Sequence, residues 1–304
     1  MDTPPCDDPV DPVEAVTEWF SRHSRDLPWR GPGVSPWGVL VSEFMLQQTP
    51  VSRVLPVWTD WMQRWATSDD LAQAPVGAAI RAWGRLGYPR RALRLHACAV
   101  ELVQQHGGTV PRDLTALRAL PGVGTYTAAA VASFAYGQRV VVLDTNVRRV
   151  LDRLLVGTDG SAAANPTRAE RDRAARLLPT DPARAAQWSV AVMELGALVC
   201  TSRAPRCATC PVADQCVWLR QGRPAEARRA RTQTYAGTDR QCRGRLLAAL
   251  RESDSPVAAA RLDQVWPNDV QRARALRTLV VDGLVESLVD GRFALPGTPA
   301  EQPD

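Results

Sequence analysis

Residues 119–138 read ALPGVGTYTAAAVASFAYGQ and form the longest stretch of the chain without a charged side chain. A membrane-spanning helix needs about 20 continuous apolar residues, whereas Pro121 and three glycines interrupt this stretch. Gly122 and Gly124 permit a tight turn and the close approach of another backbone. The small apolar residues after Thr125 indicate a helix that is buried on most of its faces. We therefore predict a glycine hairpin that leads into a buried helix.

The start of that helix offers backbone amide groups to an anion. Because the first N–H groups of a helix have no partner within it, a phosphate fits there without any side-chain charge. A tight turn between two packed helices gives the same glycine spacing, so the pattern alone leaves both interpretations open.

Most of the remaining chain has the periodicity of helices. Asp11-Pro12 is typical of an N-cap followed by a proline in the first turn, and it predicts a helix that ends near His23. Residues 140–143 (VVVL) indicate either a short strand or a buried extended segment. Because strand signals are scarce, the predicted fold class is mainly α. The other predicted helices lie within 36–110, with breaks at Pro50, Pro75, Gly87 and Gly107-Gly108, and at 146–155, 167–178 and 182–198.

The C-terminal part has a separate pattern of three helices and a hairpin. A hairpin is indicated by two apolar segments on either side of Asp290-Gly291. This order is that of a winged helix-turn-helix, a fold that serves either DNA binding or protein contact, and both readings stay open. The predicted helices are 243–251, 257–266 and 269–282, and the hairpin segments are 285–288 and 292–295. The predicted division is an acidic tail (1–8), a main helical region (9–225), a basic linker (226–238), a winged-helix-like domain (239–297) and a tail (298–304).

All 37 basic side chains are arginine, and the chain has no lysine. This composition excludes a Schiff base from a side-chain amine, a P-loop lysine and a kinase-type ATP-binding lysine. The N-terminal amine is then the one remaining candidate for amine chemistry.

The charge balance favours a polyanionic partner. The net charge is +5 and the pI is near 9.0, although the first 21 residues contain six acidic and no basic side chains. The rest of the chain therefore has 26 acidic against 37 basic residues. Nucleic acid is the first candidate for such a surface, but arginine-rich surfaces are also common in proteins from GC-rich genomes. Because the N-terminus does not resemble a secretory signal, we expect a cytoplasmic, nucleoid-associated monomer without membrane contact.

Four of the seven cysteines are closely spaced as Cys200-X6-Cys207-X2-Cys210-X5-Cys216. Four thiolates within one short loop can converge on a single metal centre. Zinc and a [4Fe–4S] cluster both accept four thiolates, and the spacing by itself leaves the metal open.

Two acidic residues are candidates for catalysis. Glu43 stands in the mostly apolar stretch 42–49 (SEFMLQQT), where desolvation raises the pKa of a carboxyl and suits it to a general acid. Asp144 follows the apolar run 140–143 and precedes a predicted helix, so helix amides would keep it ionised. Glu43 on an exposed polar face and Asp144 as a plain N-cap are the alternatives, and sequence spacing does not show that the two acids meet.

The cysteine spacing, the LPGVG hairpin and the SEFMLQQT stretch together resemble the helix-hairpin-helix DNA glycosylases of the endonuclease III and MutY type. The resemblance covers about residues 9–225. It implies a helix-hairpin-helix fold and double-stranded DNA as partner, with adenine opposite 8-oxoguanine or guanine as the substrate. It also implies a [4Fe–4S] cluster in the loop 200–216, bound by Cys200, Cys207, Cys210 and Cys216.

The resemblance implies a role for each remaining candidate. Glu43 would protonate the adenine and activate water, and Asp144 would stabilise the oxocarbenium-like sugar. Tyr126 stands where bifunctional relatives have a lysine, so the enzyme would be monofunctional, with Tyr126 and Asn146 supporting the carboxylates. The DNA contacts implied are Gln48 and Tyr88 as wedges, Thr49 and Leu86 near the opposite base, Trp29 and Arg30 near the adenine, and Gly122 and Gly124 at a phosphate.

The chain departs from the family after the cysteines. Only 88 residues follow Cys216, and no Nudix-like sequence is visible, so the chain looks like a short form without that C-terminal domain. Ser189-Val190 stand where the family often has an amide or an acid. A thymine or uracil mismatch glycosylase and a non-catalytic DNA-binding module are the alternative functions.

Overall fold

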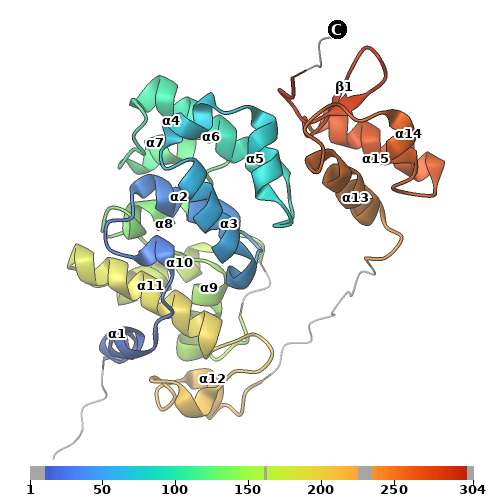
Figure 1. Ribbon diagram of the computed structural model, residues 1–304. Helices are drawn as coiled ribbons and strands as arrows, with labels where there is room; N and C mark the ends of the chain where they lie inside the picture. The colour runs from blue at the N-terminus through green and yellow to red at the C-terminus, as the bar shows by residue number, and fades with distance from the viewer. Residues whose placement is uncertain (1–10, 161–162, 225–234, 300–304) are drawn as a thin grey trace, which may run out of the picture. The chain divides into compact units, whose positions relative to one another are not determined.

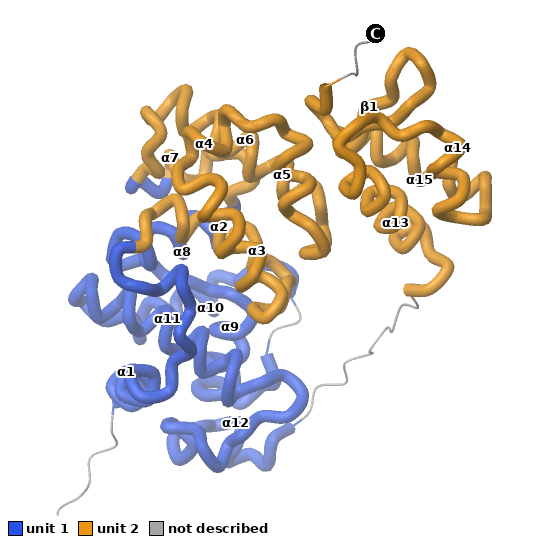
Figure 2. The backbone as a smooth tube through the Cα atoms, in the orientation of Figure 1, with its two compact units in different colours: residues 1–33, 112–114, 124–229 blue, residues 34–111, 115–123, 230–304 orange. Residues whose placement is uncertain are grey.

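The computed structural model describes residues 11–160, 163–224 and 235–299. The predicted acidic tail (1–8), most of the predicted linker (226–238) and the end of the predicted tail (298–304) lie outside these ranges. The chain forms two compact units (Figure 2). Unit 1 comprises residues 1–33, 112–114 and 124–229, and unit 2 comprises residues 34–111, 115–123 and 230–304.

Both units are built mainly of helices, which confirms the predicted fold class (Figure 1). The elements of unit 1 are α1 (Pro12–His23), η1 (Pro28–Arg30), α8 (Thr125–Phe134), α9 (Thr145–Leu151), η2 (Asp152–Val156), α10 (Arg168–Leu177), α11 (Pro182–Leu198), η3 (Cys207–Thr209) and α12 (Val217–Arg220). The elements of unit 2 are α2 (Pro36–Leu46), α3 (Val51–Arg64), α4 (Ser68–Gln73), α5 (Val76–Trp83), α6 (Arg90–His106), α13 (Asp239–Arg251), α14 (Ala259–Asp263), α15 (Asp269–Val281), β1 (Glu286–Ser287) and β2 (Phe293–Ala294). Helix α7 (Leu114–Ala119) lies almost entirely in unit 2.

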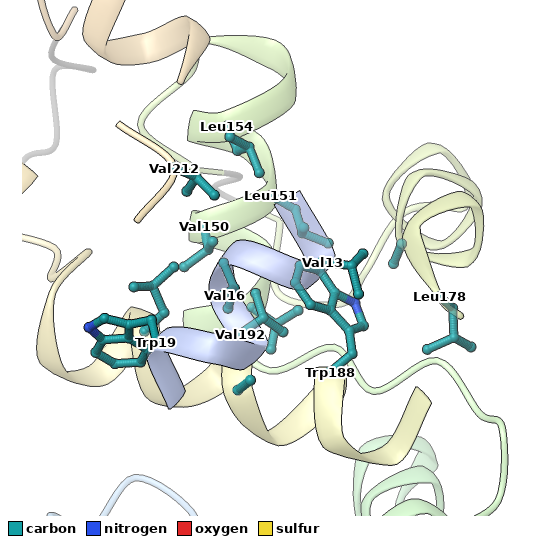
Figure 3. Packing of buried hydrophobic residues seen from close by; sticks show 14 of the residues in the cluster. Val13, Val16, Trp19, Val150, Leu151, Leu154, Leu178, Trp188, Val192 and Val212 are labelled. Carbon is teal, nitrogen blue, oxygen red and sulfur yellow. The ribbon is translucent and has the colours of Figure 1, made fainter. Parts of the chain in front are cut away.

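The main core of unit 1 lies among α1, α9 and α11. Helix α1 begins where the sequence predicts, because the Asp11 carboxylate accepts a hydrogen bond from the Val13 amide (3.0 Å). Its apolar face then packs on α11 with Val16 and Trp19 buried (Figure 3). Val150 of α9 is buried in the same cluster, so this core fixes the helix whose N-terminus holds Asp144.

Helix α8 is buried as the uncharged stretch 119–138 predicts. Each residue from Thr127 to Ser133 is shielded from solvent. The following segment, 140–143, belongs to no helix or strand, and Val142 packs against Ala129 and Ala130. The short strand is therefore the wrong one of the two alternatives, and Val142 and Leu143 of this segment are buried.

Unit 2 has a core of tryptophans where the C-terminal end of α3 meets α5. The Trp61 ring lies edge-to-face on Trp65 and on Trp83, with centroids 4.6 and 5.8 Å apart. Helices α4 and α6 pack closely beside this core, and α4 begins at a capping box formed by Thr67 and Asp70. These contacts hold the ends of α2, α5 and α6, which carry several of the predicted site residues.

The C-terminal elements of unit 2 follow the predicted order of three helices and a hairpin. Strands β1 and β2 pair antiparallel, with Glu286 opposite Ala294. The predicted helix 257–266 is wrong in extent, because Val257 pairs with Phe293 as an extended bridge and only Ala259–Asp263 is α-helical. The winged-helix interpretation of this segment stays a prediction. None of the helices in the described ranges has the length and apolar character that a bilayer crossing requires.

Candidate functional site

Glu43 is buried within α2 of unit 2. The helix starts cleanly because Ser35 caps the Gly38 amide and Pro36 occupies the first turn. Every residue from Trp37 to Met45 is buried, and Glu43 is 5% exposed. The alternative of an exposed acid on a polar helix face is therefore wrong.

Gln48 and Tyr88, the two predicted wedge residues, share an uncommon backbone conformation. Their φ angles are +55° and +46°, and Arg223 is the one other non-glycine residue in the described ranges with a positive φ. This left-handed region costs about 1–3 kcal/mol for a residue with a side chain, and such strain concentrates at functional sites. Both side chains are exposed, and Tyr88 is 49% exposed.

Arg91 joins the two turns that carry these residues. Its Nη1 donates hydrogen bonds to the carbonyl oxygens of Phe44 (3.0 Å) and Gln47 (2.5 Å). Its guanidinium carbon also lies 4.9 Å from the centroid of the Tyr88 ring. Burial lowers the pKa of Arg91. Sequence reasoning did not select Arg91, since its role depends on two turns that meet only in the fold.

Thr49 and Leu86 form the buried link between the same turns. The Thr49 hydroxyl donates to the Leu86 carbonyl (3.3 Å) and accepts from Arg91 Nη2 (3.3 Å). The two residues are 6% and 3% exposed. They lie behind the exposed Gln48 and Tyr88 side chains and hold the turns in place.

The predicted glycine hairpin is present, and its glycines have different structural roles. Gly122 has φ +80°, and a Cβ there would lie 2.8 Å from Phe44 Cε1 and 2.9 Å from Arg94 Cβ, so only glycine fits. Gly124 is the N-cap of α8, is exposed and has open space around its Cα. The side of the hairpin near Gly124 is thus open, whereas Gly122 is packed against α2 and α6.

Asp144 caps the N-terminus of α9 in unit 1. Its carboxylate accepts hydrogen bonds from the Val147 amide (2.6 Å) and from Asn146 Nδ2 (2.8 Å). Burial nevertheless raises the pKa of Asp144 above its ordinary value, and these two hydrogen bonds oppose that rise. The amide hydrogen bond therefore acts in the expected direction, towards the ionised carboxylate, but desolvation is the larger effect on the pKa.

Asn146 is held on both sides. Its Oδ1 accepts a hydrogen bond from Arg149 Nη2 (2.8 Å), and Arg149 also donates from Nε to the Cys200 carbonyl (2.7 Å). Helix α11 approaches so closely that a Cβ on Gly196 would lie 2.7 Å from Asn146 Cβ. The amide donor to Asp144 is therefore fixed in position and orientation.

Glu194 of α11 is a candidate that sequence reasoning missed. Its carboxylate is fully buried and accepts hydrogen bonds from Arg25 Nη2 (2.7 Å) and Arg30 Nη2 (3.0 Å). These two guanidinium groups outweigh the desolvation and hold the pKa of Glu194 at about 2. An acid in an apolar helix is the signal that selected Glu43, and it applies equally to Glu194. Arg30 Nη1 is buried without a hydrogen-bond partner among the described residues.

The predicted residues are distributed between the units. Trp29 is buried beside Arg30 in η1, and Tyr126 is half-buried in α8 beside Ala130. These residues belong to unit 1 with Asp144, Asn146 and Gly124, whereas Glu43, Gln48, Thr49, Leu86, Tyr88 and Gly122 belong to unit 2.

The four clustered cysteines line one hollow in unit 1, together with Arg153 and Trp218. Arg153 Nη1 donates to Cys200 Sγ (3.3 Å), and the Arg153 guanidinium carbon lies 4.3 Å from the Trp218 ring centroid. Burial and the neighbouring thiols raise the pKa of Cys210 to about 11. No group of three or more His, Cys, Asp or Glu side chains in the described ranges is arranged to hold a metal ion. Four thiols beside a guanidinium are nevertheless a donor set of the kind that an anionic cluster with thiolate ligands requires.

Known proteins match these features over most of the chain. The sequence pattern of the HhH-GPD superfamily base excision DNA repair proteins matches residues 41–176. The adenine DNA glycosylase of Mycolicibacterium smegmatis is 54% identical over 289 residues, which are 95% of this chain and 97% of that protein. The adenine DNA glycosylase of Homo sapiens is 42% identical over 211 residues, which are 66% of this chain and 38% of that protein.

Solved structures agree with the sequence matches. The structure of a thermostable thymine-DNA glycosylase has a TM-score of 0.60 and 27% identity, and it covers 69% of this chain and 95% of its own. The fold and these matches therefore define a DNA glycosylase of the helix-hairpin-helix class. Within that class, the chain belongs to the family of adenine DNA glycosylases, because the similarity to the Mycolicibacterium smegmatis enzyme extends over nearly the whole length. The protein is thus an enzyme that acts on DNA.

Proposed function

We propose that this glycosylase hydrolyses the N-glycosidic bond of adenine paired with 8-oxoguanine or guanine, and that it acts on a base flipped out of the duplex. The observation that carries this proposal is the burial of Glu43 in α2, one turn before the strained turn at Gln48. A general acid is needed there because adenine is a poor leaving group until one of its ring nitrogens is protonated.

The chemistry follows the two-carboxylate logic of glycoside hydrolysis. Glu43 donates a proton to N7 of adenine and later activates the attacking water. As the bond breaks, positive charge develops on the sugar, and an ionised Asp144 offsets it. Asn146 supports this role, since its amide hydrogen bond favours the charged carboxylate. Tyr126 supports the same carboxylates by hydrogen bonding.

Base flipping requires that side chains enter the space left in the base stack. Gln48 and Tyr88 supply them, because both are exposed at the tips of strained turns. Thr49 and Leu86 lie near the opposite base, Trp29 and Arg30 border the adenine, and the hairpin at Gly122 and Gly124 binds a phosphate. The buried Glu194 fixes Arg30 from behind.

The enzyme is monofunctional. A lyase needs an amine that traps the sugar as a Schiff base. Tyr126 stands at the position where bifunctional relatives have their lysine, and none of the 304 residues is lysine. Strand cleavage should therefore require a separate alkaline treatment.

We propose that Cys200, Cys207, Cys210 and Cys216 bind a [4Fe–4S] cluster. When bound, the cluster cross-links the loop 200–216 and keeps its basic residues in place. Arg153 stabilises the anionic thiolates by its hydrogen bond to Cys200 Sγ. Iron and sulfide analysis tests this assignment, together with an absorbance band expected at about 400 nm. A zinc content without iron would contradict it.

One assay tests the function as a whole. The protein is incubated with duplexes that contain A opposite 8-oxoguanine, A opposite guanine, or T opposite guanine, and alkali is added afterwards. We expect release of adenine from the first two duplexes and strand nicking only after alkali. Release of thymine instead would favour the thymine mismatch glycosylase, and binding without any release would favour the non-catalytic module.

Glu43→Gln tests the acid directly. We expect it to slow adenine release by at least about 100-fold, since general acids contribute 10²–10⁴-fold, while duplex binding persists. Glu101→Gln on α6 is the matched control and should retain the rate. Wild-type activity in Glu43→Gln would refute the assignment of the acid.

A further inference from the structure

The C-terminal helices of unit 2 are docked on α5 by a reciprocal pair of arginines. Arg251, at the end of α13, donates from Nε to the Ile80 carbonyl near the end of α5 (2.9 Å). Arg81, near the end of α5, donates from Nη2 to the Ser253 carbonyl just after α13 (2.8 Å). Each arginine thus satisfies carbonyl groups at the negative end of the other helix. Burial lowers the pKa of Arg251 to about 10, which marks this contact as a desolvated one.

This docking brings the start of α13 to the turn that carries Tyr88. The Arg240 guanidinium carbon lies 5.6 Å from the Tyr88 ring centroid and 6.0 Å from that of Tyr235. Arg91 lies 4.9 Å from the centroid of the same Tyr88 ring. Two arginines from separate parts of the sequence therefore contact one exposed tyrosine by cation–π interactions.

The charge of Arg240 is available to a ligand. Its neighbour Asp239 is already paired, because its carboxylate accepts from Arg274 Nη2 (2.7 Å) and from Gln271 Nε2 (2.8 Å). Arg240 itself forms no ion pair with the residues that the structure describes, and its side chain is exposed. Arg85 is exposed on the turn that leads to Tyr88.

We propose that Arg240 binds a phosphate of duplex DNA beside Tyr88, so that the C-terminal helices form part of the DNA-binding surface. Arg240 then has a second effect, since stacking on the ring limits the orientations of Tyr88 before DNA arrives. The proposal extends the proposed function of Tyr88 as a wedge, but it requires only that the protein binds duplex DNA.

Salt dependence distinguishes a phosphate contact from a loss of packing. Each phosphate neutralised by the protein contributes about −0.9 to the slope of log K against log salt concentration. In the Glu43→Gln background, which binds without releasing adenine, we expect Arg240→Ala to weaken binding of a duplex with A opposite 8-oxoguanine and to reduce the slope by about 0.9. Arg240→Lys should restore the slope, because it restores the charge.

Arg261→Ala is the matched control, because Arg261 is an exposed arginine of α14 in the same segment. It should leave both the affinity and the slope unchanged, and the melting temperature of each variant should match that of the parent. Equal slopes for Arg240→Ala and Arg261→Ala would overturn the proposal, and so would a weaker affinity with an unchanged slope. Since the readout is binding, failure of the wild type to release adenine would refute the proposed function and leave this test intact.

Discussion

At the scale of single residues, the two strained backbone positions lie beside the side chain that stabilises them. Gln48 and Tyr88 adopt a left-handed backbone that side chains disfavour, and such conformations persist only where the surroundings enforce them. Arg91 supplies that enforcement, because it binds the Phe44 and Gln47 carbonyls and contacts the Tyr88 ring. The exposed residues thus depend on a buried one.

Arg91→Lys tests this dependence. Lysine is a point donor that cannot bind two carbonyls in the forked geometry of a guanidinium. We expect the free energy of unfolding to fall by about 1–3 kcal/mol, the cost of buried acceptors left unpaired, and duplex affinity to fall as the turns loosen. Chemical denaturation and duplex titration measure both effects. Arg94→Lys, at an exposed position of α6, should change neither, and equal stability of the two variants would remove Arg91 from this role.

Asn146 should control the pH dependence of adenine release. Burial raises the pKa of Asp144, and the hydrogen bond from Asn146 lowers it. Asn146→Leu removes the lowering contact, so the pKa rises further. Because Asp144 must be ionised to offset charge on the sugar, activity is lost as pH falls through that pKa, and a higher pKa moves the loss to higher pH. The acidic limb of the pH profile should therefore move to higher pH in Asn146→Leu.

Single-turnover rates measured across pH give this acidic limb directly. Asn268→Leu, at the N-cap of α15, serves as the control and should keep the wild-type profile. A lower rate in Asn146→Leu with an unmoved acidic limb would show that Asn146 acts only through packing.

At the scale of elements, the sequence predicts helices whose ends carry local signals. Helices α1 and α11 have the predicted bounds, because Asp-Pro pairs set their starts at Asp11-Pro12 and Asp181-Pro182. The predicted helix 257–266 was too long, since the pairing of Val257 with Phe293 is a contact between distant residues that periodicity does not contain. The predicted helix 146–155 likewise changes to a π-turn after Leu151, and this turn places Arg153 beside Cys200.

The candidate site was also predictable only in part: its two acids were predicted, but its contacts between distant residues were not. Glu43 and Asp144 were found because an acid within or beside an apolar run is visible in the sequence. The pairing of Glu194 with Arg25 and the hydrogen bond from Arg91 to Phe44 were not predictable, because they join residues 169 and 47 positions apart. Sequence spacing does not reveal such pairs, because they form only when the helices pack in the folded protein.

Gly196 tests the packing of α11 on α9, and Gly244 of α13 is the contrasting position. A Cβ at Gly196 would lie 2.7 Å from Asn146 Cβ and 3.0 Å from its carbonyl oxygen, so Gly196→Ala should push the helices apart. We expect a loss of about 1–3 kcal/mol in stability and slower adenine release, as Asn146 moves from Asp144. At Gly244 of α13 a Cβ would meet only Tyr235 Oη, at 3.5 Å, so Gly244→Ala should stabilise the protein by about 0.5–1 kcal/mol. Thermal unfolding of both variants measures these changes in stability. A Gly196→Ala variant that is more stable than the wild type would show that α11 packs less tightly on Asn146 than described.

At the scale of the whole molecule, composition restricts the chemistry more firmly than any motif does. The basic surface is supplied entirely by arginine, whose guanidinium binds phosphates in forked geometry and stays protonated at every working pH. Arginine side chains also cap helices, hold Glu194 and contact Tyr88. A chain of this kind can bind DNA strongly and still lack a nucleophilic side-chain amine.

This absence gives a prediction for the full-length enzyme. Borohydride reduces a Schiff base between an amine and the sugar to a stable covalent adduct. With a duplex that contains A opposite 8-oxoguanine, we expect the wild-type protein to release adenine and to form no adduct, because no lysine is present and arginine is not deprotonated. Denaturing electrophoresis of labelled DNA detects the adduct, and a bifunctional relative with lysine at the position of Tyr126 is the positive control. An adduct that disappears when the N-terminal amine is blocked would contradict the monofunctional mechanism and assign the nucleophile to Met1.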